Sequence, residues 1–383
     1  RLAKDYPKEG TAAMMGTVPG RGGARPHPTR RASSGEGNRL MGTGADSIEP
    51  PEIWAGLRAL IDGGEPSDLQ EEALVGVAIR GEVAALVADL RPALAPALAD
   101  SITREVFIAL QLDRALQVAA EALNAAGIEA PVIVKGYAAA RLVYENPNHR
   151  VGVDIDVLVT EEAFDRTLEV LRQTGFRQVT SSTLKERHGA RPWEEELAWV
   201  TEGGSVSLDV HRKLAASERF EVDHDGIRDR AVTVEDLPWP VSHPEDTLLH
   251  TVLHMATNRY WVPLKSWVDL RRLLAHEAVD LDRTFERARQ WRMRSALWAA
   301  LWVCERWFPG SISPSRLTTI EPPWGVQMAL KRGLGEDGHR PIRGNPRGLA
   351  SQLLYGPLLS DDLRAVARWF VESARQVQRM AST

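Results

Sequence analysis

Apolar residues recur at helical spacing through the first folded part of the chain. They fall at intervals close to 3.6 residues between positions 74 and 90, and again between positions 102 and 123. Asp100 or Ser101 is placed to cap the second of these helices, and Gly127 is placed to end it. The pattern therefore predicts that the folded part of the chain begins with helices.

The hydrophobic pattern changes at Pro131, where short apolar runs replace the helical period. Strands are predicted at 132–134, 153–159, 176–179, 197–200 and 206–210, and helices at 137–144 and 161–174. Thr160 is a suitable N-cap for the second helix, and Gly175 is suited to close it. The order β-α-β followed by further strands predicts a small α/β domain.

After Pro244 the helical period returns and continues nearly to the end. Helices are predicted at 245–257, 263–276, 282–291, 295–307 and 361–380. The fold class is therefore α+β, with helical segments on both sides of a small α/β domain. The expected parts are a Gly-, Pro- and Arg-rich disordered tail (1–50), an N-terminal helical segment (51–130), the α/β domain (131–215) and a C-terminal helical domain (216–383).

Composition and charge exclude several classes of protein. The chain has 383 residues, of which 43% are hydrophobic, so a sizeable core can form. The net charge of -5 argues against a general nucleic-acid coat, and the single cysteine, Cys304, excludes an intramolecular disulfide and a cysteine-rich zinc site. No run approaches the roughly 20 apolar residues of a membrane span. We therefore expect a cytoplasmic protein with no membrane partner.

Two aspartates stand inside an otherwise apolar strand. Asp154 and Asp156 are two residues apart, so both side chains point to the same face, and Asp209 has the same setting in a later strand. Carboxylates crowded in this way repel one another, and Mg²⁺ or Mn²⁺ resolves the repulsion. A solvated face on an edge strand is the alternative. Leu158 shares the face of Asp156, which favours the metal site, and three such aspartates suit two-metal phosphoryl or nucleotidyl transfer.

Lys135 and Gly136 lie where a predicted strand turns into a helix. Glycine lets the backbone approach a phosphate closely, a helix N-terminus favours anions, and the lysine adds a point charge. Arg150, four residues before Asp154, is expected either to meet phosphate oxygens or to pair with a carboxylate. These three residues are the candidate nucleotide-binding group, although a plain turn with a solvent-exposed lysine is the alternative.

Three other signals carry less weight. The G-x-G-x-x-G string at 333–338 lacks the strand-turn-helix context, so we interpret it as a loop. His250 and His254 lack the glutamate of a zinc protease; ordinary packing competes with a role for them, together with His211, in an acceptor pocket. Basic residues interleaved with aromatic residues over 259–294 fit RNA, but a solvated helix face is favoured.

The stretch VIVKGYAAARLVYENPNHRVGVDIDVLV, residues 132–159, resembles the uncharacterised nucleotidyltransferase family proteins of bacteria. These belong to the DNA polymerase β-like nucleotidyltransferase superfamily. The segments 208–211, 248–254 and 267–270 also resemble the family, and the likeness covers roughly residues 100–310. One departure from the wider superfamily is Gly136-Tyr137 where Gly-Ser is usual, so we expect Lys135 to replace the missing serine hydroxyl in holding a phosphate.

The resemblance implies a reaction and a role for each residue. An acceptor hydroxyl or phosphate would attack the α-phosphorus of an NTP, with ATP favoured, and release pyrophosphate. By the same resemblance, Asp154 and Asp156 would bind both metal ions, Mg²⁺ or Mn²⁺, and Asp209 would bind the catalytic ion and take the acceptor proton. Lys135, Gly136 and Arg150 would bind the nucleotide.

The acceptor and two alternative functions stay open at this point. A peptide or a small molecule is favoured as the acceptor, with RNA or a protein as the other candidates. One alternative is a non-catalytic binding or antitoxin module that keeps the fold, and the other is a phosphotransferase that moves the γ-phosphate. The presence of Asp154, Asp156 and Asp209 favours an enzyme over a non-catalytic module.

Overall fold

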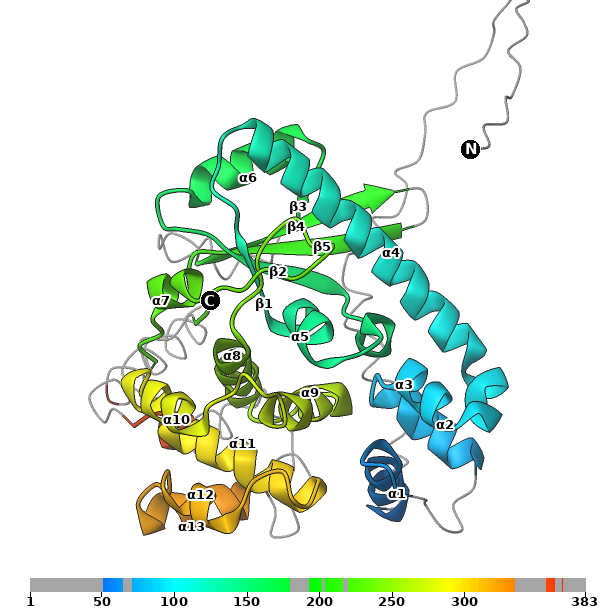
Figure 1. The fold of residues 1–383 in the computed structure, drawn as a ribbon, viewed down its shortest axis with the longest axis vertical. Helices are drawn as coiled ribbons and strands as arrows, with labels where there is room; N and C mark the ends of the chain where they lie inside the picture. The colour runs from blue at the N-terminus through cyan, green and yellow to red at the C-terminus, as the bar shows by residue number, and fades with distance from the viewer. Residues whose placement is uncertain are drawn as a thin grey trace, which may run out of the picture. The chain divides into compact units, whose positions relative to one another are not determined.

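A computed structural model of the chain describes residues 51–64, 71–179, 193–201, 204–215, 220–334, 356–361 and 367. The predicted tail (1–50), nearly all of the predicted helix at 361–380 and most of the G-x-G-x-x-G string lie outside these residues. Within them the structure is mixed α and β, with helices before and after one five-stranded sheet, as the sequence predicts (Figure 1).

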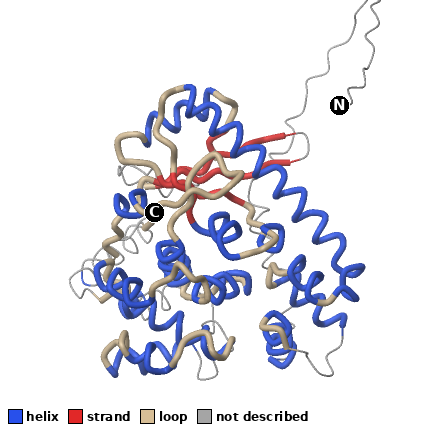
Figure 2. Tube along the Cα trace, viewed as in Figure 1, coloured by secondary structure: helices blue, strands red, loops and turns tan. Residues whose placement is uncertain are grey.

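The sheet has the strand order β1-β2-β5-β4-β3. Its strands are β1 (Val132–Val134), β2 (Asp154–Leu158), β3 (Arg177–Gln178), β4 (Glu194–Thr201) and β5 (Gly204–His211). β2 is antiparallel to β1 and parallel to β5, while β4 is antiparallel to both β5 and β3. The two aspartate-bearing strands are therefore neighbours in the middle of the sheet (Figure 2).

The helices before the sheet are α1 (Pro51–Ile61), α2 (Glu71–Arg80), α3 (Ala84–Leu90) and α4 (Ala95–Ala125), with a short 3-10 helix η1 (Pro92–Leu94). The expectation that Asp100 or Ser101 caps the long helix is wrong, because α4 begins at Ala95 directly after η1. Pro96 falls in its first turn, where a missing N–H removes no helical hydrogen bond. Gly127 does follow its end, with a φ of 64°.

α5 (Lys135–Val143), η2 (Pro147–Arg150) and α6 (Phe164–Gln173) lie between the strands. α6 begins three residues later than the expected start, and the Thr160 hydroxyl accepts a hydrogen bond from the backbone of Ala163 in the turn before it. The helices after the sheet are α7 (His224–Asp229), α8 (Pro244–Thr257), α9 (Leu264–Leu274), α10 (Leu281–Gln290), α11 (Arg294–Trp307), α12 (Pro314–Thr318) and α13 (Trp324–Leu334), followed by η4 (Gly356–Leu359). None of the described helices is both long and apolar enough to cross a membrane.

The two faces of the sheet pack against different apolar clusters. Ile155 and Val157 pack with residues of α4 and α6 on one face. Leu158 on the other face belongs to the cluster that α8, α9 and α11 form with the N-terminal helices. The face that carries Asp156 is therefore covered by the C-terminal helices, as the burial of Leu158 requires, and it is not a solvated edge (Figure 1).

Candidate functional site

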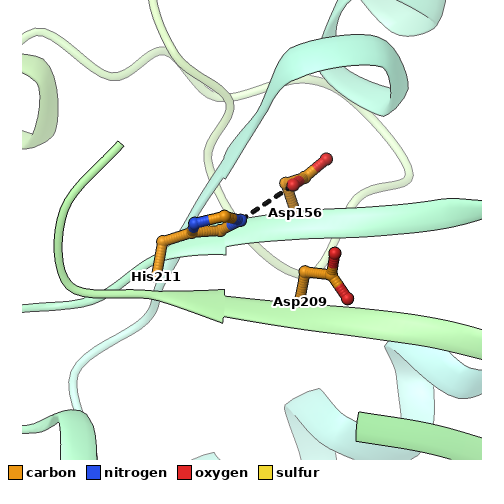
Figure 3. Close-up of side chains that lie close together, drawn as sticks. All are labelled: Asp156, Asp209 and His211. Atoms are coloured by element: carbon orange, nitrogen blue, oxygen red, sulfur yellow. Dashed lines mark hydrogen bonds and ion pairs between the residues drawn. The ribbon is translucent and has the colours of Figure 1, made fainter. Parts of the chain in front are cut away.

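The pairing of β2 with β5 brings the predicted carboxylates together. In the parallel register Asp156 lies opposite Asp209, and Leu158 lies opposite His211. Asp156, Asp209 and His211 each offer one ligand atom, and these atoms all lie within 4.8 Å of one another (Figure 3). Asp154, two residues before Asp156 on β2, does not belong to this group of three.

Asp156 is the buried centre of the site. Its Oδ1 lies 2.8 Å from Nε2 of His211 (Figure 3). The same oxygen also forms an ion pair with the Lys135 ammonium. Burial alone would raise the pKa of Asp156, but the charge of Lys135 and the contact with His211 outweigh it and lower the pKa. Asp156 is therefore a carboxylate at neutral pH.

Asp209 has the opposite electrostatic environment. Burial and the charges of Asp156 and Asp154 raise the pKa of Asp209 to about 8. Its Oδ1 is buried and has no hydrogen-bond partner among the described residues. Burial and the charge of Asp156 also raise the pKa of Asp154. Without a cation, the site therefore holds more carboxylates than its surroundings can keep ionised.

These residues fit a divalent cation. The two carboxylates are suitable ligands for Mg²⁺ or Mn²⁺. The imidazole of His211 is a better ligand for Mn²⁺ or another first-row transition metal than for Mg²⁺. The unpartnered Oδ1 of Asp209 lacks the electrostatic partner that a cation supplies. Asp156, Asp209 and His211 are therefore the residues that would hold the ion, with Asp154 beside them on the same strand face.

Lys135 and Gly136 occupy the junction of β1 and α5. Lys135 is the first residue of α5 and has a φ of 57°, a backbone conformation that few non-glycine residues adopt. Such strain recurs at functional sites. Gly136 lies against the guanidinium of Arg150, since a Cβ added at Gly136 would come within 2.4 Å of Arg150 Nη2. The glycine is therefore required here by the close approach of Arg150.

This contact predicts the effect of a single methyl group. Gly136→Ala should lower the free energy of unfolding by about 1–3 kcal/mol, because Arg150 cannot move away without breaking its ion pair with Asp269. Chemical denaturation checks the value. The matched control is Gly325→Ala in α13, where an added Cβ meets nothing within 4 Å and no destabilisation is expected. Equal stability of the two variants would contradict this account of Gly136.

Arg150 is held by a carboxylate that the sequence analysis did not identify. Its Nε lies 3.0 and 2.8 Å from the two carboxylate oxygens of Asp269 in α9. The Tyr144 hydroxyl donates to the same carboxylate at 2.8 Å, and the guanidinium of Arg272 lies 4.5 Å from the centre of the Tyr144 ring. Of the two roles expected for Arg150, the structure shows the pairing with a carboxylate. The sequence signal that could have identified Asp269 is its position between the apolar residues Val268 and Leu270, which suggests a buried charge that needs a partner.

The two histidines of α8 have different environments. His250 is 2% exposed, and its Nδ1 has no hydrogen-bond partner within the described part of the chain. Burial and the nearby charge of Lys135 lower the pKa of His250 well below its ordinary value, so the ring is neutral. His254, one turn further along the helix, has an exposed side chain. Desolvation by the surrounding protein and the nearby charge of Lys135 lower the pKa of His254 to about 4. The structure therefore places both histidines close to the carboxylate site, with His250 buried and His254 accessible.

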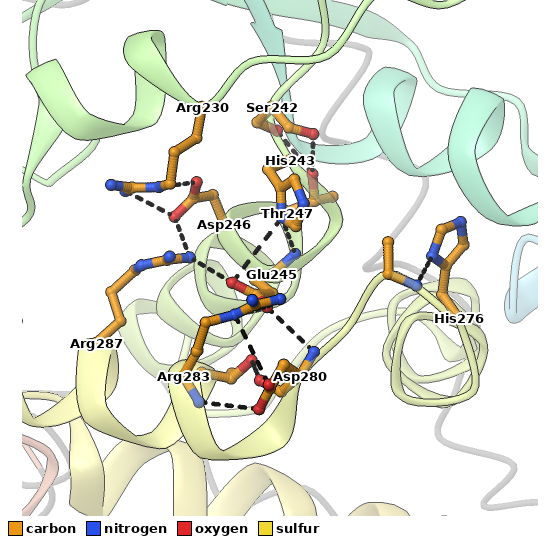
Figure 4. A network of polar contacts seen from close by, with 12 residues as sticks. Arg230, Ser242, His243, Glu245, Asp246, Thr247, His276, Asp280, Arg283 and Arg287 are labelled. Atoms are coloured by element: carbon orange, nitrogen blue, oxygen red, sulfur yellow. Dashed lines mark hydrogen bonds and ion pairs between the residues drawn. The ribbon is translucent and has the colours of Figure 1, made fainter.

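A second set of charges at the start of α8 has a structural role. Glu245 and Asp246 are buried, and they form ion pairs with Arg230, Arg283 and Arg287 (Figure 4). Five further basic residues of the 259–294 region are also paired with acidic ones: Lys265 with Glu82, Arg271 with Asp62, Arg289 with Glu286, Arg292 with Glu221 and Arg294 with Asp361. These pairs neutralise much of the charge that an RNA-binding surface would need.

Comparison with known proteins gives one match, which extends over more than half of the chain. The family described as "Uncharacterised nucleotidyltransferase" matches residues 69–309. This range includes Asp154, Asp156, Asp209 and the Lys135-Gly136 turn. Neither the curated proteins nor the solved structures contain a match to the chain.

Proposed function

The chain belongs to the uncharacterised nucleotidyltransferase family, and we propose that it is a metal-dependent enzyme that transfers an NMP from an NTP to an acceptor hydroxyl or phosphate. Pyrophosphate is the second product, and ATP is the favoured donor. The observation that carries the proposal is the convergence of Asp156, Asp209 and His211 from two adjacent strands, with their ligand atoms within 4.8 Å of one another. The match to a family of transferases and the presence of a site suited to a divalent cation both support metal-dependent nucleotidyl transfer.

Different residues of the site would bind the metal ion, bind the phosphates and position the turn at Lys135 and Gly136. Asp156, Asp209 and His211 would hold Mg²⁺ or Mn²⁺, which neutralises charge on the triphosphate and polarises the phosphorus that is attacked. Lys135 and Gly136 at the N-terminus of α5 provide positive charge and backbone N–H groups for phosphate oxygens. Arg150, which is held by Asp269, packs its guanidinium against Gly136 and so fixes the position of this turn. Catalysis would then rest on positioning and on charge neutralisation.

We propose that the acceptor reaches the site from the α8 side. The neutral, buried ring of His250 has an unpartnered nitrogen close to Asp156 and His211, and it offers a hydrogen bond to an incoming group. A peptide or a small molecule is favoured over RNA, because several basic residues of the 259–294 region already have acidic partners.

Labelled nucleotides test the reaction type. The enzyme is incubated with Mn²⁺, a pool of small metabolites and peptides or a pool of tRNA, and NTP labelled on the α- or the γ-phosphate. Label from the α-phosphate in an acceptor, with release of pyrophosphate, is the expected result. Transfer of γ-label alone would show a phosphotransferase, and transfer of neither label from any NTP would favour a non-catalytic binding or antitoxin module.

Cation binding should depend on pH because Asp209 must lose a proton. The pKa of Asp209 is raised to about 8 in the cation-free site, so the carboxyl is protonated below that pH and must be deprotonated to bind an ion. The affinity for Mn²⁺ should therefore rise as the pH is raised from 6 to 8, by up to about tenfold per unit, and level off above 8. Calorimetry in buffers of different ionisation enthalpy measures the released proton; a pH-independent affinity would contradict the assignment of Asp209.

A further inference from the structure

The ammonium of Lys135 lies where the proposed function requires a metal ion. Lys135 Nζ forms an ion pair with Asp156 Oδ1, the same oxygen that contacts His211 Nε2 at 2.8 Å. The Lys135 side chain is 23% exposed and that of Asp156 is 4% exposed, so the pair is largely shielded from water. One oxygen atom of Asp156 therefore already has two partners.

We propose that Lys135 is the internal counter-ion of the cation-free site and must leave Asp156 before a divalent cation can bind there. This inference rests on the proposed function and adds a regulatory role to a residue first identified as a phosphate ligand. A divalent ion and an ammonium cannot both contact Asp156 Oδ1, because like charges at that separation repel strongly in a shielded site. The two cations therefore compete for the same carboxylate.

The electrostatics of the site support an ammonium in this position. Burial alone would lower the pKa of Lys135, but the charges of Asp156, Asp154 and Asp209 outweigh burial and raise it. Lys135 thus stays charged and partly compensates three carboxylates that would otherwise repel one another.

Lys135 directly follows β1, and a bound triphosphate would be a second anionic partner for its ammonium. It is the first residue of α5, and the free N–H groups of a helix N-terminus attract phosphate oxygens. A triphosphate bound there offers the ammonium a new partner and frees Asp156 for the divalent ion. Nucleotide and cation should therefore strengthen each other's binding, and the cation alone should bind weakly to the wild-type protein.

Titration of the nucleotide-free protein with Mn²⁺ alone tests this competition. Lys135→Gln removes the competing charge, so its affinity for Mn²⁺ should exceed that of the wild type by at least about fivefold, the lower end of typical coupling between ligands. The matched control is Lys331→Gln, which removes the same charge from a lysine of α13 whose ammonium lies over the rings of Trp298 and Trp302. Its affinity should stay within about twofold of wild type.

A second measurement follows Lys135 in the wild-type protein and needs no variant. Amine-selective acetylation, quantified by mass spectrometry, should label Lys135 faster when saturating Mn²⁺ displaces its ammonium, while labelling of Lys331 stays constant. Unchanged labelling of Lys135, or a Lys135→Gln affinity no tighter than wild type, would overturn the inference and leave the metal site intact. Failure of every variant to bind Mn²⁺ would overturn the metal site of the proposed function as well.

Discussion

Asp156→Asn should reduce nucleotidyl transfer by about 10²–10³-fold or more while the protein stays folded. The amide keeps the size of the side chain and an acceptor oxygen for Lys135 and His211, but it removes the charge at the centre of the site. The rate of α-label transfer measures the loss, and circular dichroism confirms the fold. Asp209→Asn is expected to act in the same direction, because it removes the second carboxylate ligand.

The control for this prediction is Glu195→Gln on β4. Glu195 lies opposite Val210 in the antiparallel register, so its side chain is on the sheet face away from Asp209, and it forms an ion pair with Arg172. Its change removes a carboxylate charge from the same sheet but from the opposite face, so activity should stay within a few-fold of wild type. Comparable losses in Glu195→Gln and Asp156→Asn would show that general charge, and not coordination, explains the effect.

Asp269→Ala should destabilise the protein by about 3–5 kcal/mol, the typical effect of removing one partner from a buried ion pair. The change leaves the guanidinium of Arg150, which is 8% exposed, and the buried Tyr144 hydroxyl without their shared acceptor. Denaturant unfolding measures the loss. Because Arg150 supports Gly136, weaker nucleotide binding should accompany the lower stability.

Two comparisons separate a buried pair from an ordinary surface pair. Replacing both partners, as in Arg150→Met with Asp269→Leu, should cost less stability than Asp269→Ala, because no buried charge is left unpaired. Asp282→Ala removes the exposed partner of Arg316 and should cost less than about 1 kcal/mol. A loss for Asp269→Ala no larger than that for Asp282→Ala would contradict the structural role of the Arg150–Asp269 pair.

The sequence was most informative where chemistry and periodicity coincide. Residues 132–134 form a strand with the predicted bounds, and the aspartates predicted to lie in strands are carried by β2 and β5, which are neighbours in the sheet. The spacing of Asp154 and Asp156 places both side chains on one face of an apolar strand, where two charges need a partner. The family match confirms the resemblance that these residues carried.

The contacts that the sequence could not predict join segments distant in the chain. Asp269 lies 119 residues from Arg150, and Asp156 lies 55 residues from His211. Such pairs depend on how α9 and β5 pack, which local periodicity does not determine. The start of α4 was misjudged for a different reason: a good capping residue inside a helix looks the same in sequence as one at its end.

Calorimetric titration of ATP, GTP, CTP and UTP, each with Mn²⁺, into wild type and Asp156→Asn tests the central claim most directly. The account predicts that at least one nucleotide, with ATP favoured, binds the wild type only when the ion is present and that this binding is lost in Asp156→Asn. Binding that is equally tight in both proteins, or that needs no ion, would contradict a nucleotidyltransferase site built on Asp156, Asp209 and His211.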